Sequence, residues 1–258
     1  MHTKVDILGI QVSSISLDHL LLECSDIIHN NAKASICITP VNSILAATKN
    51  PMVKDIYNNA NYTLCDGMPV LWASQFLGTP IVERITGLDL LPTLLQYCAS
   101  NHFSLFFLGA SPGVGLSLKA KAEQLYPNIN IKGVYCPPFA NKFEQSENEK
   151  MVSLINEAQP HIILVSLTAR KQDIWIAENL AKINANIAMG IGGAFEVTAG
   201  LIKRAPHWMQ VSGLEWLFRF GQEPKRMFKR YFIQAPLFIP LIIQQKIRSI
   251  LIKSKGNA

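Results

Sequence analysis

The clearest structural signal in this 258-residue chain is the stretch Ser104-Leu105-Phe106-Phe107-Leu108-Gly109-Ala110-Ser111-Pro112-Gly113. It begins with an apolar run of strand length and ends in a glycine-rich turn, after which apolar residues recur at helical spacing from Val114 to Leu125. A strand that passes through a tight turn into a helix is half of a β-α-β unit. The stretch therefore predicts a parallel sheet covered by helices.

The same alternation of strand and helix continues on both sides of this stretch. Apolar or β-branched runs predict strands, and apolar residues three and four positions apart predict helices between them. We expect strands at residues 35–39, 62–65, 104–108, 131–135, 161–167 and 187–191, and helices at residues 17–30, 68–77, 88–99, 114–125, 147–158 and 172–182. The predicted fold class is a Rossmann-like α/β domain over residues 1–199, with its ligand site at the carboxyl ends of the strands.

The chain changes in character after Gly200, where helical patterns are interrupted by prolines and glycines. Residues 200–258 contain 11 lysines and arginines against two glutamates, a net charge of +9, whereas residues 1–199 carry a net charge of −3. Aromatic residues are interleaved with the basic ones. We therefore predict a basic helical appendage with an anionic partner, for which a membrane surface, a nucleic acid and the phosphates of a sugar nucleotide all qualify.

The most apolar part of this appendage is residues 233–252. The run at residues 231–245 has only 15 residues and includes two prolines, whereas a helix that spans a bilayer needs about 20. We therefore expect no transmembrane helix and predict a helix that lies in the membrane interface, with a core-closing helix as the alternative. Because the predicted sheet ends near residue 191, we expect the α/β domain to fold without residues 233–258.

The N-terminus and the cysteines bear on the compartment. The first residues lack the basic segment, apolar run and cleavage site of an export signal, which predicts a cytoplasmic protein. The five cysteines are odd in number and form no C-x-x-C pair, so we expect reduced core cysteines rather than disulfides or a zinc site.

The glycine-rich turn from Gly109 to Gly113 has two possible functions. Its backbone N–H groups suit a phosphate at the start of a helix, and a plain tight strand-to-helix turn without a ligand is equally expected. It also matches the G-x-S-x-G motif of serine hydrolases, with Ser111 as nucleophile and Asp173 and His207 downstream. Pro112 argues against a hydrolase, because the residue after the nucleophile must donate a backbone N–H to the oxyanion and proline has none.

Three further positions lie next to predicted strands or helices. Asp66 follows a strand, where it suits either a catalytic base or the N-cap of the next helix. Arg84 precedes a helix and is either a phosphate ligand or a surface residue. Glycines at positions 190, 192 and 193 permit the close approach of a ligand. The chain has no D-x-D motif and no His/Cys/carboxylate cluster at metal spacing, so we expect no divalent metal.

Taken in order along the chain, the motifs resemble those of the WecG/TagA/CpsF glycosyltransferases. The resemblance extends over residues 5–232 and is carried by residues 38–42 (ITPVN), 65–67 (CDG), 83–90 (ERITGLDL), 107–113 (FLGASPG), 171–175 (KQDIW), 190–195 (GIGGAF), 204–206 (RAP), 213–219 (GLEWLFR) and 223–226 (EPKR). It implies an inverting, metal-independent enzyme without a cofactor. Such enzymes move a hexose, typically N-acetylmannosamine or its uronic acid, from a UDP-sugar to N-acetylglucosamine on undecaprenyl diphosphate.

The resemblance also assigns roles to residues of this chain. It makes Asp66 the general base and places arginines around the diphosphate, and it adds a donor pocket. The arginines are Arg84, Arg219, Arg226 and Arg230, and the donor pocket comprises Thr39, Asn42, Gln172 and Glu196, next to the glycines at Gly109 and Gly192. The implied partners are the UDP-sugar, the lipid-linked acceptor and the anionic cytoplasmic face of the membrane, to which the enzyme would attach peripherally, with homo-oligomerisation left open.

Three departures from the family pattern concern the donor pocket. Residues 168–170 are Thr-Ala-Arg where Gly-x-Pro is usual, Asp173 replaces a glutamate, and Glu196 replaces an aspartate. They affect the expected donor sugar more than the type of reaction. Two alternatives from other classes remain, namely a serine hydrolase that uses Ser111 and a non-catalytic basic module that binds nucleic acid.

Overall fold

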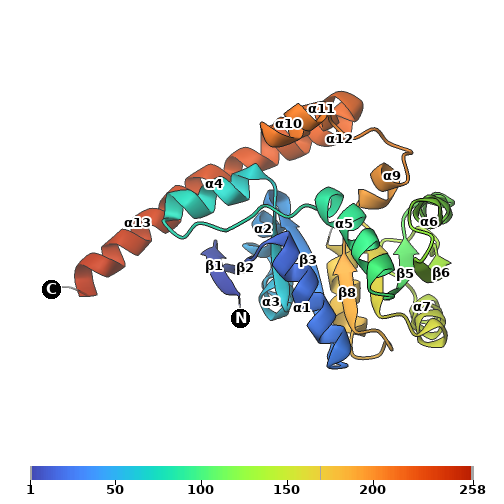
Figure 1. The fold of residues 1–258 in the computed structure, drawn as a ribbon. Coiled ribbons are helices and arrows are strands. Elements are labelled where there is room, and N and C mark those ends of the chain that lie inside the picture. Colours follow the sequence, from blue (N-terminus) through green and yellow to red (C-terminus); the bar gives the residue numbers. More distant parts are fainter. Residues whose placement is uncertain (1, 169, 257–258) are drawn as a thin grey trace.

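The strands form one sheet at the centre of the computed structural model, which describes residues 2–168 and 170–256. Their order across the sheet is β1-β2-β4-β3-β8-β7-β5-β6 (Figure 1). β1 and β2 form an antiparallel hairpin, and the other described pairings are parallel. The strands are β1 (Thr3–Ile7), β2 (Ile10–Ser14), β3 (Ala34–Pro40), β4 (Tyr62–Asp66), β5 (Ser104–Gly109), β6 (Asn130–Tyr135), β7 (Ile162–Ser166) and β8 (Ile187–Gly190).

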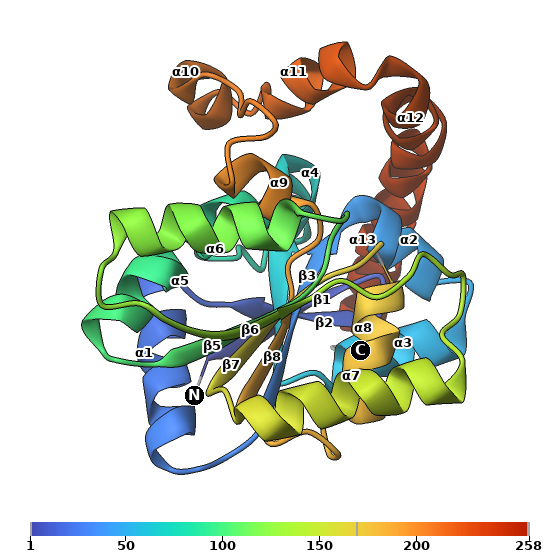
Figure 2. The same ribbon diagram turned by 90° about the vertical axis from the view of Figure 1, so that its right-hand side faces the viewer.

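Helices cover both faces of this sheet (Figure 2). One face carries α1 (Leu17–His29), α5 (Gly87–Ser100) and α6 (Val114–Leu125), and the other carries α2 (Val41–Ala47), α3 (Pro51–Asn59), α7 (Gln145–Ala158) and α8 (Lys171–Asn179). In β5, Phe107 packs against α5 and α6, whereas Phe106 packs against α7 and α8. A strand that is buried on both faces needs apolar residues at nearly every position, as the sequence of β5 has.

The predicted α/β fold class is confirmed, as are the six predicted strands and the six predicted helices. The sequence analysis missed the β1–β2 hairpin and the short helices α2 and α3. The hairpin turns at Leu8 and Gly9, which have φ values of 55° and 81°, and the Gly9 N–H donates to Asp6 Oδ1 at 3.0 Å. Elements of five to nine residues are too short to show a clear hydrophobic period.

The described chain after β8 is helical. α9 (Ala194–Thr198) is followed by α10 (His207–Val211), α11 (Glu215–Gln222), α12 (Pro224–Phe228), the π-helical turn η1 (Lys229–Gln234), the 3₁₀ turn η2 (Ala235–Leu237) and α13 (Phe238–Gly256). The segment from α10 to α12 runs across the top of the molecule in Figure 1, and α13 then descends beside α4 (Met68–Leu77). The C-terminal helices therefore lie over the carboxyl ends of the parallel strands, where the fold places its ligand site.

One helical stretch, Lys229–Ile252, is long and apolar enough to cross a membrane by length and composition. The helical stretch is longer than the 15-residue run that the sequence indicated, because Pro236 and Pro240 do not end the helix, and the expectation of no transmembrane helix stays a prediction. The π-helical and 3₁₀ turns carry the chain through the region of the two prolines. Phe238 and Ile242 are nevertheless buried in the core cluster that includes α2, α3 and α4, so the core-closing alternative holds for this side of α13.

Candidate active site

A cavity of about 560 Å³ lies where β3, β4, β7 and β8 end. Its floor comes from the strand ends and the loops that follow them, including Ile38, Asp66, Leu167 and Ile191. Its walls come from α4, from the start of α5 and from the C-terminal segment. The volume is in the range of cavities that hold a small molecule or cofactor.

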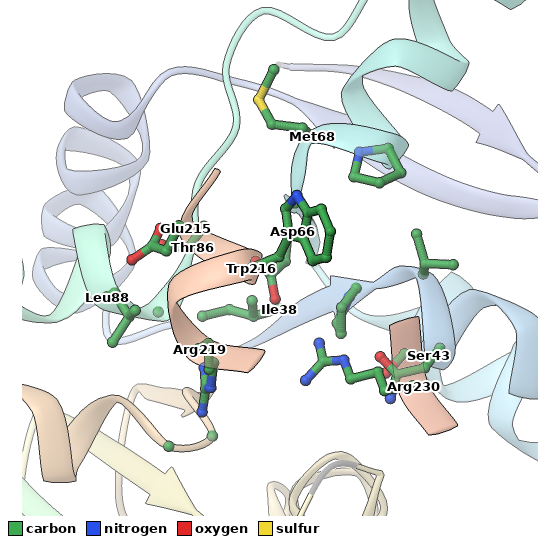
Figure 3. A pocket seen from close by; sticks show the side chains of 18 of the residues that line it. Ile38, Ser43, Asp66, Met68, Thr86, Leu88, Glu215, Trp216, Arg219 and Arg230 are labelled. Carbon is green, nitrogen blue, oxygen red and sulfur yellow. The ribbon is translucent and has the colours of Figure 1, made fainter. Parts of the chain in front are cut away.

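Asp66 is the last residue of β4, and its carboxylate points into the space between Arg219 and Arg230 (Figure 3). The next residue, Gly67, has a φ of 92° and is the N-cap of α4, which no side chain caps. The interpretation of Asp66 as a helix cap is therefore wrong. Burial raises the pKa of the Asp66 carboxyl above its ordinary value, although Arg230, Arg84 and Arg219 act in the opposite direction. A half-buried carboxylate of raised pKa at a ligand cavity fits a proton acceptor.

Three of the predicted arginines, Arg84, Arg219 and Arg230, line this cavity from different elements. Arg84 precedes α5, and its Nη2 lies 3.3 Å from Asp89 Oδ2. Arg219 belongs to α11 and Arg230 to η1, and among the described side chains no carboxylate forms an ion pair with either of them. Arginines that form no close ion pair among the described side chains favour an anionic ligand. The fourth predicted arginine, Arg226, is in α12, and its side chain lies outside the described residues.

Three predicted donor-pocket residues, Asn42, Gln172 and Gly192, also line the cavity. Gln172 Oε1 accepts a hydrogen bond from the Gly192 N–H at 3.0 Å, which ties α8 to the loop after β8. The buried Asn42 Oδ1 has no hydrogen-bond partner among the described residues, and neither has the neighbouring Ser43 Oγ. Buried polar atoms of this kind are usually satisfied, so these two are available to a ligand.

Three other predicted residues, Thr39, Gly109 and Glu196, lie outside the lining among the described residues. Thr39 points to the opposite side of β3 from Ile38, because side chains alternate along a strand. Gly109 has a φ of 101°, and a Cβ there would lie 2.3 Å from the Ser166 carbonyl oxygen, so its lack of a side chain serves strand packing. Glu196 Oε2 is buried without a partner among the described residues, and a Cβ added at Gly193, which lines the cavity, would lie 3.8 Å from it.

An ion-pair cluster fixes α11 over the cavity. Arg204 Nε donates to Glu215 Oε1 at 3.1 Å, its Nη1 donates to the Leu88 carbonyl at 3.1 Å, and its Nη2 pairs with Asp89 Oδ1. Although burial alone would raise the pKa of Asp89, hydrogen bonds from Arg204 and Thr86 lower it. The cluster joins the start of α11 to the start of α5, and sequence analysis did not assign Arg204 or Glu215 to the site.

Comparison with known proteins agrees with the motifs and with this geometry. The model of the glycosyl transferase WecG/TagA/CpsF family matches residues 5–251. The chain belongs to this family. It is 30% identical over 245 residues to the N-acetylglucosaminyldiphosphoundecaprenol N-acetyl-beta-D-mannosaminyltransferases of Staphylococcus aureus strains MRSA252 and MW2. These alignments cover 94% of this chain and 93% of each relative.

The structure of this glycosyltransferase gives no support to the serine-hydrolase alternative. Ser111 is exposed, and among the described residues neither Ser111 nor His207 lines the cavity. Asp173 is buried, and its Oδ2 accepts a hydrogen bond from the Tyr57 hydroxyl at 2.9 Å. A catalytic triad is therefore not assembled from these residues, because Asp173 is buried whereas Ser111 and His207 are exposed and lie outside the lining.

Asp173 has a different place in the glycosyltransferase. Its carboxylate forms part of the cavity floor, and its Oδ1 has no hydrogen-bond partner among the described residues. Burial raises the pKa of Asp173 to about 6, against a smaller opposite effect of the Tyr57 hydrogen bond. Within residues 2–168 and 170–256, no group of three or more His, Cys, Asp or Glu side chains could hold a metal ion. Metal independence stays a prediction.

Proposed function

We propose that this glycosyltransferase moves N-acetylmannosamine or a related hexose from a UDP-sugar to N-acetylglucosamine on undecaprenyl diphosphate. The observation that carries the proposal is Asp66 at the end of β4, in a cavity that three arginines share. The names of the Staphylococcus aureus relatives support the acceptor and the N-acetylmannosaminyl group. A UDP donor agrees with the cationic lining, since a nucleotide diphosphate needs opposite charge when it binds and when it leaves.

The proposed reaction is a single displacement. The acceptor hydroxyl gives its proton to the Asp66 carboxylate, and its oxygen forms a bond to the anomeric carbon of the donor sugar. The bond from that carbon to the UDP oxygen breaks at the same time, and UDP leaves with the electron pair. One carboxylate is enough for this reaction, because attack from the face opposite the leaving group inverts the anomeric centre and needs no covalent nucleophile.

The arginines are proposed to stabilise the departing UDP. Arg219 and Arg230 reach the cavity from the C-terminal segment, and Arg84 reaches it from the α/β domain. Fixed cations that face developing negative charge lower the barrier most when the site excludes water. Arg226 completes this set by the family resemblance. Residues 1–199 would thus supply the base and most of the donor pocket, and residues 200–258 would close the site.

We further propose that the enzyme lies on the cytoplasmic face of the membrane without spanning it. Exposed isoleucines form a stripe along the outer side of α13, at Ile239, Ile243 and Ile247. The opposite side of the same helix packs on the α/β domain through Phe238 and Ile242. A helix that is held on one side and apolar on the other fits the plane of a membrane interface.

A UDP-release assay tests the proposed function. The donors would be UDP-N-acetylmannosamine, UDP-N-acetylglucosamine and UDP-glucose, and the acceptor N-acetylglucosaminyl diphosphoundecaprenol, each with and without EDTA. We expect acceptor-dependent release of UDP from the N-acetylmannosamine donor in the presence of EDTA. Release that is equal with and without the acceptor would indicate a hydrolase, and release that needs added Mg²⁺ would contradict metal independence.

A further inference from the structure

The cavity has two chemically different sides. One side lies at the ends of β7 and β8. It is formed by polar side chains, including Thr168 and Gln172, and by the backbone of glycines such as Gly193. The other side lies beyond the end of β4 and is apolar and aromatic. It is formed by Met68, Pro69 and Trp72 of α4 and by Trp216, Phe232 and Ala235 of the C-terminal segment.

The order of the strands separates these two sides. β3 lies between β4 and β8, so the end of β3 stands between the apolar and the polar side. Asp66 is at the end of β4 and is joined through Gly67 directly to α4. A substrate that fills the polar side therefore meets the apolar side at Asp66. We expect the apolar side to hold part of the substrate whose hydroxyl gives its proton to Asp66. In the proposed function, that substrate is the acceptor.

The apolar side continues into an exposed surface strip along α4. Pro69, Trp72 and Phe76 lie three and four residues apart, on one side of the helix, and are exposed. Trp72 keeps 54% of its surface exposed although it lines the cavity. At the far end of the strip, Lys246 of α13 lies 6.0 Å above the Phe76 ring and donates to the Leu77 carbonyl at 3.1 Å. The strip thus leads from the cavity to α13.

Aromatic rings build the opposite wall of the apolar side. Phe232 packs on three neighbours, at ring-centroid distances of 6.3 Å to Trp216, 5.3 Å to Phe220 and 5.3 Å to Phe228. Despite these contacts, 49% of its surface is exposed. Large apolar surfaces left open beside a cavity usually mark a binding site.

We infer that the apolar side, which we call the lipid groove (Met68, Pro69, Trp72, Trp216, Phe232 and Ala235), binds the first isoprene units of the acceptor's polyprenyl chain. The inference rests on the proposed function. Charge complementarity supports this occupant, because Arg230 stands beside the groove in η1 and the segment that forms one wall carries a net charge of +9. An apolar chain that begins at a diphosphate meets both features, whereas a neutral peptide would use only one.

The strip along α4 and the isoleucine stripe on α13 continue the same path. They lead from the groove to the side of the molecule that we propose to face the membrane. The acceptor's chain would leave the bilayer beside α13, pass Trp72, and place its diphosphate and sugar next to Arg230 and Asp66. The polyprenyl chain is much longer than the groove, so only the units nearest to the diphosphate are held.

Acceptors of different chain length test this inference. One acceptor carries N-acetylglucosaminyl diphosphate on undecaprenol, and the other carries the same sugar diphosphate on an ethyl group, which is too short to reach Trp72. Both are assayed in detergent micelles, where docking to a bilayer plays no part. We expect Trp72→Ser and Phe232→Ser to lower kcat/KM for the undecaprenyl acceptor by about tenfold or more, as for loss of a large apolar contact, and to leave the ethyl acceptor unchanged.

Control variants separate the groove from fold and surface effects. Trp72→Phe keeps an aromatic ring and should retain most of the activity on undecaprenol. Leu22→Ser removes a side chain of similar exposure, 58% against 54%, on α1 away from the cavity, and should change neither acceptor. An equal loss on both acceptors, or no loss on the undecaprenyl acceptor, would overturn the inference.

A photoaffinity probe distinguishes failure of the inference from failure of the proposed function. The probe is farnesyl diphosphate with a diazirine on its first isoprene unit. Labelling of the groove at Trp72 or Phe232, competed by undecaprenyl diphosphate, supports a lipid-diphosphate site even if no sugar is transferred. Sugar transfer without any labelling of the groove would instead leave the proposed function standing and overturn the lipid groove.

Discussion

Asp66 has two properties that destabilise the folded protein. Its carboxyl is largely buried, and no described side chain donates a hydrogen bond to it. Its raised pKa means that the folded protein holds the Asp66 proton more tightly than the unfolded chain does. Above that pKa the ionised carboxylate therefore lowers stability. This cost indicates a residue that is kept for function.

Substitution Asp66→Asn should abolish catalysis without harming the fold. The amide keeps the shape of the carboxyl but accepts no proton at neutral pH, and loss of a general base typically lowers kcat by about 10²- to 10⁴-fold. Because the variant also removes the cost of the charge, its melting temperature at pH 7.5 should equal or exceed that of the wild type. Steady-state UDP release and differential scanning fluorimetry measure the two effects. Wild-type turnover by Asp66→Asn would exclude Asp66 as the base.

A second prediction at the residue scale concerns the effect of Asp173 on the free energy of unfolding. Its pKa of about 6 lies above the ordinary value of an aspartate. The stabilisation that comes from its proton is fully present below about pH 4 and is lost as the pH rises to about 6. Asp173→Asn lacks this titration and can still accept the Tyr57 hydrogen bond. The variant should therefore exceed the wild type in free energy of unfolding at pH 7.5 by on the order of 1–3 kcal/mol.

Urea unfolding at pH 7.5 and at pH 4 measures this difference. The gain should shrink at pH 4, where the wild-type carboxyl is already protonated. Tyr57→Phe is the matched control, because it removes the hydrogen bond that favours the Asp173 carboxylate most and should lower stability at pH 7.5. A gain from Asp173→Asn of the same size at both pH values would show that Asp173 does not titrate in this range.

The sequence predicted part of the site for physical reasons that the structure makes clear. Asp66 ends a parallel strand and Asn42 and Gly192 follow parallel strands closely, and the carboxyl ends of such strands share one edge of the sheet. Thr39 shows the limit of this reasoning, because a shift of one residue along a strand turns a side chain to the opposite face. The sequence did not identify Trp72 or Ser43 as site residues, because apolar and small polar residues are common in helices of every kind.

At the scale of elements, the position of α11 over the cavity depends on Arg204. Its guanidinium reaches Asp89, Glu215 and the Leu88 carbonyl at once, which the single ammonium of lysine does not reproduce. With Arg204 in place, the two carboxylates have a second cation besides Arg84. Without Arg204, Arg84 alone would have to neutralise the carboxylates of Asp89 and Glu215, and α11 would lose the ion pairs that join it to α5. The position of Arg219 over the cavity therefore depends on a residue outside the lining.

Substitution Arg204→Met should weaken donor binding, because α11 and its Arg219 would no longer be held over the cavity. Charge-assisted hydrogen bonds contribute about 1.5–3 kcal/mol, so we expect the dissociation constant for UDP to rise by about tenfold. Isothermal titration calorimetry measures the constant, and limited proteolysis should show faster cleavage near α11. Lys203→Met removes a charge from the exposed neighbouring side chain and serves as the control. Equal UDP affinity in Arg204→Met and the wild type would separate the ion-pair cluster from donor binding.

The elements themselves were largely predictable, and the exceptions share a cause. The sheet and its major helices have apolar patterns long enough to define a period. The C-terminal helix did not follow its local signals, because Pro236 falls in a 3₁₀ turn that follows a π-helical turn and Pro240 falls in the first turn of α13, where a proline is tolerated. The packing of Phe238 and Ile242 on the N-terminal half of the chain is a tertiary contact, and no local signal predicts it.

At the scale of the whole molecule, α13 has two opposite surfaces. Its inner surface belongs to the fold, because Phe238 and Ile242 are buried and Gln245 Nε2 donates to the Asp6 carbonyl of the β1–β2 hairpin at 2.9 Å. Its outer surface carries the isoleucine stripe. The expectation that the α/β domain folds without residues 233–258 overlooked the inner surface. Removing the whole helix would confuse loss of stability with loss of membrane binding.

Substitutions on the two surfaces of α13 should therefore have opposite effects. Replacing Ile239, Ile243 and Ile247 together by serine should release the protein from anionic vesicles while the melting temperature stays unchanged, because these side chains are exposed. Phe238→Ala should lower the free energy of unfolding by about 3–5 kcal/mol, as for a buried phenylalanine, and should leave vesicle binding by the folded protein intact. Vesicle sedimentation and urea unfolding measure the two effects.

The salt dependence of vesicle binding separates a surface helix from a spanning one. Each basic residue near an anionic surface contributes about 1 kcal/mol, an attraction that salt screens. The wild type should therefore leave vesicles at high salt or in alkaline carbonate, whereas a helix that spans the bilayer would stay. Retention under these conditions would make Lys229–Ile252 a membrane span and would require Phe238 and Ile242 to leave the core. Binding by the triple serine variant in low salt would instead place the docking surface on other residues, with Trp208 and Val211 of α10 the next exposed apolar pair to replace.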